Sequence, residues 1–161
     1  SLLAQRRYLQ ARALAELDQI DEALALLAAD TSPAAELLRA GIYWRGQRWA
    51  SAAETTESLL GNRWRAEDGL KPIEQSQVVQ LAVSYYMAGD TQSLRGLNRR
   101  YGDKMAKSPH AETFRVLTHK VDQSQTKFRD LAGQIARVAD LEAFMASYRN
   151  KVKNGGLSAI N

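Results

Sequence analysis

Apolar residues recur along this chain every three or four positions, the spacing of one face of an α-helix. The spacing is seen near both ends of the chain, at Leu9, Ala13, Leu17 and Ile20 and again at Phe128, Leu131, Ile135 and Val138. No strict alternation of apolar and polar residues continues for five or more positions, so no segment competes as a β-strand. The pattern predicts an all-α protein.

Three prolines divide the helical pattern. Pro33 follows Ser32, and Pro109 follows Ser108. Serine before proline fits an N-cap followed by the first helical residue, because the hydroxyl accepts from a free backbone N–H and proline lacks the N–H that would have no partner. The third, Pro72, stands 39 residues after Pro33 and 37 before Pro109. Such a spacing, with two helices per unit, is typical of stacked helical hairpins.

Each unit also contains a turn between its two helices. Gly46 and Gly89 stand where a helix C-terminus favours a left-handed residue, and Asp21 and Asp90 are placed to cap the helix that follows. The predicted helices before residue 108 are Leu2–Leu17, Asp21–Ala29, Pro33–Arg45, Trp49–Leu60, Pro72–Ala88 and Thr91–Lys107. A longer polar connection joins the fourth to the fifth.

The second unit resembles a tetratricopeptide repeat. Its residues Ala40, Tyr43, Gly46, Trp49 and Ala52 match the family's small residue, aromatic residue, turn and alanine of the second helix. The third copy contains Ala82, Tyr85, Gly89 and Asp90, and the first contains Ala11, Leu14, Ile20 and Ala23. The copies are offset by 29 and then 42 residues, where the family has a regular repeat.

The resemblance implies a right-handed α-solenoid of about three hairpins over residues 1–107. We expect residues 108–153 to form a helical C-terminal cap, with helices near 109–122, 124–138 and 140–153, and residues 154–161 to form a flexible tail. Because the apolar pattern is already under way at the first residues and the C-terminal stretch is similar to the end of large bacterial repeat proteins, we expect a section of a longer bacterial chain.

Composition agrees with helices and argues against catalysis. The chain has 25 Ala and 20 Leu against 12 Ile plus Val, and β-branched residues are the ones that sheets favour. It has no cysteine, and His110 and His119 stand nine residues apart, which is not a metal-ligand spacing. No phosphate-binding glycine motif or nucleophile elbow is present. We therefore predict no enzyme activity, no cofactor and no metal.

The family resemblance also suggests a binding surface. First helices line the concave groove of tetratricopeptide repeats, and their counterparts here are Tyr8, Arg12, Trp44, Arg45, Val79, Val83 and Tyr86. Aromatic and arginine side chains are common anchors for a bound peptide. The alternative is that these side chains fill the space between the helices.

Charge is distributed unevenly. Residues 1–60 carry a net charge of −2 and residues 61–161 a net charge of +6. A basic stripe on one helix contributes Arg95, Arg99, Arg100, Lys104 and Lys107. Such a stripe can bind RNA or an acidic protein surface, although it has little aromatic interleaving and belongs to no recognised DNA- or RNA-binding module. A solvated helix face is the commoner meaning.

The sequence thus predicts a non-catalytic protein–protein interaction module that holds a peptide or protein segment in a helical groove, with an anion-directed binder as the alternative. No run of about 18 apolar residues is present, so we expect no membrane insertion. We expect a cytoplasmic or periplasmic location, and the lack of cysteine slightly favours the periplasm.

Overall fold

The computed structural model describes residues 1–119, and every regular element in that range is a helix. The elements are α1 (Leu2–Glu16), α2 (Ile20–Leu27), α3 (Pro33–Arg45), α4 (Trp49–Leu60), the 3₁₀ turn η1 (Arg63–Arg65), α5 (Pro72–Met87), α6 (Thr91–Met105) and α7 (Ala111–His119). The all-α prediction is confirmed for these residues. The predicted helices 124–138 and 140–153, the end of the helix predicted at 109–122 and the tail 154–161 lie outside this range.

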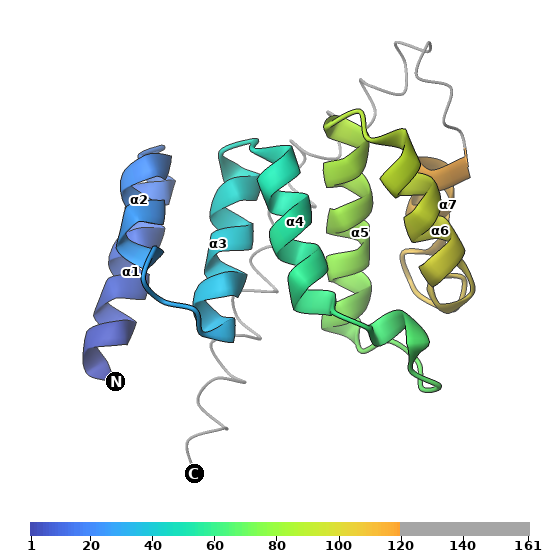
Figure 1. Cartoon of the computed structure of the whole chain (residues 1–161), viewed down its shortest axis with the longest axis horizontal. Coiled ribbons are helices and arrows are strands. Elements are labelled where there is room, and N and C mark those ends of the chain that lie inside the picture. The colour runs from blue at the N-terminus through green and yellow to red at the C-terminus, as the bar shows by residue number, and fades with distance from the viewer. Residues whose placement is uncertain (120–161) are drawn as a thin grey trace. The chain divides into compact units, whose positions relative to one another are not determined.

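Consecutive helices pack against each other in pairs. The pairs α1–α2, α3–α4 and α5–α6 follow one another in sequence order (Figure 1). The second pair contacts the first through α3, which packs on both α1 and α2, and it contacts the third through α4, which packs on α5. Helix α7 packs on α5 and α6.

The turns within the three pairs share one backbone geometry. Asp18, Gln47 and Gly89 all have a positive φ, of 64°, 55° and 71°. The following residue in each turn donates its N–H to a carbonyl five residues earlier, with N···O distances of 2.8 Å for Gln19 to Leu14, 2.9 Å for Arg48 to Tyr43 and 2.9 Å for Asp90 to Tyr85. This is the Schellman ending of a helix. The first helix of each of the three pairs therefore ends in the same kind of turn.

Gly46 does not have the predicted left-handed conformation. Its φ is −76°, and the next residue, Gln47, has the positive φ instead. A methyl group built at Gly46 would lie 3.0 Å from Cγ2 and 3.2 Å from Cγ1 of Ile20. Glycine at this position therefore allows the end of α3 to lie close to the first residue of α2, because the contact leaves no room for a side chain.

Two of the predicted caps are present. The Ser32 hydroxyl accepts from the backbone N–H of Ala35 at 3.3 Å, at the start of α3. Asp90 accepts from the N–H of Ser93 at 3.0 Å, at the start of α6. Each side chain satisfies one of the helix N–H groups that have no partner within the helix.

The other two predicted caps are wrong. Helix α2 begins at Ile20, one residue before Asp21, so Asp21 lies inside the first turn, where the helix dipole favours an acidic residue. Helix α7 begins at Ala111. The Ser108 hydroxyl instead donates to the carbonyl of Met105 at 2.8 Å and accepts from the N–H of His110 at 3.2 Å. These bonds close the turn that follows α6.

Small residues bring the first pair close to α3. One buried cluster joins both helices of that pair to α3 and contains Ala11, Ala15, Ile20, Ala23, Leu27 and Ile42. The alanines allow the helix axes to approach, because no longer side chain separates them. Among residues 1–119, no helix is both long enough and apolar enough to cross a membrane.

Candidate functional site

The predicted groove residues of α1 are tied to the adjoining connection. The Tyr8 hydroxyl donates to Oδ2 of Asp30 at 2.7 Å and lies 3.0 Å from Oγ of Ser32. Oδ1 of Asp30 accepts from the N–H of Ser32 at 3.0 Å. The hydrogen bonds from Ser32 and then Tyr8 lower the pKa of Asp30 to about 2. Arg12 is half-buried, and its Nε finds no hydrogen-bond acceptor among the described residues.

The predicted groove residues of α3 have structural partners. Trp44 is 7% exposed, and its ring meets that of Trp49 edge to face with centroids 5.2 Å apart. Arg45 reaches the end of α1, where Nε donates to the carbonyl of Ala15 at 2.7 Å and Nη2 to that of Glu16 at 3.2 Å. A cation at a helix C-terminus satisfies carbonyls that have no partner within the helix. Both residues therefore hold α3 in place.

The predicted groove residues of α5 lie on a helix that is buried on every side over residues 77–85. Val79 and Val83 are buried, and Tyr86 is half-buried. A bound peptide would find little accessible side chain at the two valines. Binding by the groove residues stays a prediction, and the structure does not bring the seven together on one open surface of the described residues.

The basic stripe of α6 divides into two sets. Arg95, Arg99 and Lys107 are exposed. Arg100 forms an ion pair with Oε1 of Glu57 on α4, at 2.8 Å. Lys104 donates to the carbonyl oxygens of Ala66 at 2.5 Å and Asp68 at 2.8 Å. Two of the five cations thus bind the chain itself.

The Glu57 carboxylate joins three helices. It accepts from the Tyr85 hydroxyl of α5 as well as pairing with Arg100 of α6. Burial, followed by the hydrogen bond to Glu57, raises the pKa of Tyr85. The hydroxyl therefore stays protonated and remains a donor at any physiological pH.

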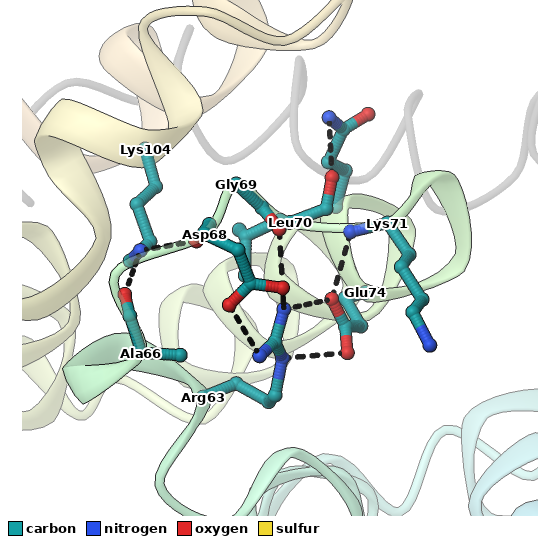
Figure 2. Close-up of polar contacts among 9 residues, drawn as sticks. Arg63, Ala66, Asp68, Gly69, Leu70, Lys71, Glu74 and Lys104 are labelled. Atoms are coloured by element: carbon teal, nitrogen blue, oxygen red, sulfur yellow. Dashed lines mark hydrogen bonds and ion pairs between the residues drawn. The ribbon is translucent and has the colours of Figure 1, made fainter.

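A polar clamp holds the connection between α4 and α5 (Figure 2). Arg63 donates to both oxygens of Asp68, at 3.0 and 3.2 Å, and to the carbonyl of Gly69 at 3.1 Å. Its Nε also lies 2.7 Å from Oε1 of Glu74, whose other oxygen accepts from the N–H of Lys71 at 2.7 Å. These contacts raise the pKa of Arg63, and the Arg63 hydrogen bond lowers that of Asp68.

The clamp and Lys104 act on the same connection from two sides. Arg63 lies within the connection, in η1, while Lys104 reaches it from α6. The two cations hold Asp68 through different atoms, Arg63 at the carboxylate and Lys104 at the carbonyl. These contacts hold the connection that leads into α5.

A polar depression of about 600 Å³ lies between the first two turns. Its lining includes the acidic residues Asp18, Asp21 and Glu22 and the basic residues Arg45 and Arg48. Arg48 pairs with Asp21 at 2.6 Å, and Arg45 is held by the end of α1. Within the part of the chain that the structure describes, no three histidine or acidic side chains gather as a metal site requires.

Four exposed leucines occur on α1 and at its C-cap, and none of them was assigned to a binding site from the sequence. Leu2, Leu3, Leu9 and Leu17 are 79%, 72%, 59% and 72% exposed, and all belong to α1 or its C-cap. The buried residues of this helix are instead Ala11 and Ala15. The spacing of Leu9, Ala13 and Leu17 was the available signal, because it places the three residues on one face of the helix, and the structure leaves that face exposed while Ala11 and Ala15 on another face are buried.

No protein-family model, curated protein or solved structure matches the chain. The resemblance to tetratricopeptide repeats therefore stays a prediction.

Proposed function

We propose that this chain is a non-catalytic protein–protein interaction module, built as a right-handed α-solenoid of tetratricopeptide-like hairpins. The three identical turns support the repeated construction. The four exposed leucines of α1 support a protein as the partner, because large apolar side chains gathered on one helix mark a surface that another protein covers.

The exposed leucines are the observation that carries the proposal. Burying one leucine side chain is worth about 1.5–3 kcal/mol, so three on α1 and a fourth at its C-cap offer a partner a substantial driving force. Helix α1 is attached to the rest of the molecule by the hydrogen bonds of Tyr8 and Arg45, which do not involve the leucines. A rigid helix that presents leucines binds with a low ordering cost.

Photo-crosslinking in the cells that produce the protein tests the proposal. A photoreactive amino acid replaces Leu9, and in a matched control it replaces Glu54, an exposed residue of α4. We expect a discrete protein adduct from position 9 and none from position 54. Equal labelling from both positions, no adduct from either, or adducts only with nucleic acid would overturn the proposal.

Anion-directed binding is the second candidate, supported by the exposure of Arg95, Arg99 and Lys107. A single-stranded RNA oligonucleotide is the probe, titrated at about 50 mM and 200 mM salt. Binding that weakens steeply with salt and is abolished by Arg95→Glu with Arg99→Glu would support this function. Binding that is absent at the lower salt concentration would eliminate it.

A further inference from the structure

The exposed side of α1 carries one line of residues along its whole length, which we call the outer face. The outer face consists of Leu2, Arg6, Leu9, Ala13 and Glu16, together with Leu17 directly after the helix. The first five step by four, three, four and three positions, the spacing of one helix face. All six are exposed. The pair that contains α1 forms one end of the row of helices, and α1 packs on α2 and α3 (Figure 1).

The charges of the outer face are opposite at its two ends. Arg6 lies in the first half of the helix, whereas Glu16 is its last residue and exposed Asp18 follows just beyond it. An anionic membrane would attract the first end and repel the second. A surface with this charge order is complementary to itself when it is reversed, so a second copy of the chain matches it.

The charges also select the direction in which two copies meet. In a parallel pair, Arg6 would lie beside Arg6 of the other copy and Glu16 beside Glu16, and like charges repel. In an antiparallel pair centred near Leu9, Arg6 lies opposite Ala13 of the other copy, whose small side chain leaves room for it. Helical side chains point toward the N-terminus of their own helix. Arg6 therefore extends toward Glu16 of the other copy.

We propose that the outer face of α1 is the contact surface of a symmetric dimer, in which a second copy of this chain packs its own α1 antiparallel to the first. Leu9 lies near the two-fold axis against its own counterpart, Leu2 lies opposite Leu17 of the other copy, and Arg6 pairs with Glu16. One patch that serves both partners is the arrangement of a two-fold dimer. The inference rests on the proposed function and deepens it by naming the partner.

The apolar area suits a contact of this kind. The four exposed leucines include Leu3, which borders the outer face. Burying an exposed leucine removes about 100 Å² of apolar surface from water, so eight leucines from two copies remove about 800 Å². A specific interface buries about 1,200–2,000 Å² in total. Arg6, Ala13 and Glu16 contribute to the remainder, with the two charged residues in the place of a polar rim.

Sedimentation equilibrium of the full chain tests the proposal. We expect the mass of two chains at about 100 μM, because interfaces of standard size have a Kd in the micromolar range or below. Leu9→Glu places two carboxylates near the two-fold axis and should raise the Kd of the dimer about a hundredfold or more. Glu54→Arg, at an exposed position of α4, is the control and should leave the mass unchanged. Circular dichroism checks that each variant is folded.

Charge exchange tests the pairing between the copies. Arg6→Glu alone or Glu16→Arg alone should raise the Kd of the dimer about tenfold, because each brings like charges together. The two substitutions in one chain should restore most of the affinity, since the pair is then reversed and not removed. The two positions are ten residues apart in one helix, too far to interact within it. Restoration therefore reports a contact between copies.

Single cysteines report the direction of the two helices, because the chain has no cysteine of its own. A short bis-maleimide reagent should join a Leu2→Cys chain to a Leu17→Cys chain when the two are mixed. It should not join either variant to itself, since in the antiparallel dimer two equivalent positions lie about 22 Å apart along the helix axis. Efficient crosslinking within each variant alone would indicate a parallel pair.

Several results would overturn the proposal. They are the mass of a single chain at about 100 μM, a dimer that survives Leu9→Glu, combined charge substitutions that restore no affinity, and a parallel pair in the crosslinking experiment. The proposed function fails separately. A single-chain mass with a photo-crosslinked adduct to a different protein at position 9 would remove the dimer and leave the function standing, whereas a single-chain mass with no protein adduct would remove both.

Discussion

Gly46 at the end of α3 lies against Ile20 at the start of α2, so close that an added methyl group would be 3.0 Å from Cγ2 of Ile20. Ile20 is itself 7% exposed and belongs to the buried cluster that joins the first helical pair to α3. The absence of a side chain at Gly46 thus sets how closely the second pair approaches the first.

Gly46→Ala should destabilise the protein. The new methyl group has to displace Ile20 or move α3 away, and overpacking of this kind costs typically about 1–3 kcal/mol. A small gain from reduced freedom of the unfolded chain offsets part of the cost. We expect a net loss of about 1–2 kcal/mol in the free energy of unfolding, measured by urea denaturation with an unchanged m-value.

Gly96→Ala is the matched control. A methyl group at Gly96 would lie no closer than 3.7 Å to a neighbouring atom, the Nη2 of Arg99. This substitution within α6 should stabilise by about 0.5–1 kcal/mol. In an Ile20→Ala background the effect of Gly46→Ala should vanish, because the clashing atoms are gone. A Gly46→Ala effect that persists there would place its cause in the backbone of the turn.

The sequence predicts the helices of this fold well, two of its four assigned caps, and the distant contacts poorly. Ser32 and Asp90 are correctly assigned as caps. Asp21 and Ser108 fail because a capped helix begins directly after its cap, whereas these helices begin one residue before Asp21 and three residues after Ser108. Gly46 is misassigned because a side chain at this position is excluded by Ile20, a residue that is distant in sequence. The chemistry of a glycine alone does not distinguish a left-handed turn from a close approach.

The same limit applies to the candidate site. Arg100 and Lys104 have the helical spacing of a basic stripe, but their partners Glu57 and Ala66 are 43 and 38 residues earlier in the chain. The exposed and buried faces of α1 show the same dependence on distant residues. The apolar spacing of Leu9 and its neighbours is visible in the sequence, but which face is covered depends on the helices that pack beside it.

Arg63→Lys should loosen the connection between α4 and α5. Lysine cannot donate hydrogen bonds to both oxygens of Asp68 and also pair with Glu74, because it lacks the planar guanidinium group with its several N–H donors. We expect amide hydrogen exchange over residues 61–71 to become several-fold faster, while exchange within α1 and α3 is unchanged. Uniformly faster exchange in all helices would show instead that the clamp supports the whole domain.

Acid titration should reveal the Asp30 contacts. The Asp30 pKa of about 2 lies below the value of about 3.9 for an unfolded chain, so its contribution to stability is present above about pH 4 and is lost as pH falls toward 2. Tyr8→Phe removes one hydrogen bond to the carboxylate and should raise the Asp30 pKa. Carbon-13 NMR of the carboxyl group measures both values. An ordinary pKa in the unaltered chain would show that these hydrogen bonds are not formed in solution.

Trp44→Ala separates a core role from a groove role. Trp44 is 7% exposed and packs on Trp49, so we expect a loss of about 3–5 kcal/mol in the free energy of unfolding. Tyr86→Ala is the comparison, because Tyr86 is a half-buried groove candidate. It should cost less than Trp44→Ala in the same denaturation experiment. Unaltered stability of the Trp44→Ala variant would contradict the core role and favour the groove role of Trp44.

The two sets of basic residues on α6 should respond differently to charge reversal. Arg95→Glu with Arg99→Glu changes exposed side chains and should leave the free energy of unfolding within about 0.5 kcal/mol of its original value. Arg100→Glu instead places a carboxylate beside Glu57 and removes the cation that neutralises it, so we expect a loss of about 1 kcal/mol or more. High salt should reduce that difference, since it screens the repulsion. Equal stability losses for both variants, measured by thermal and urea denaturation, would contradict the division of the stripe into exposed cations and cations that bind the chain.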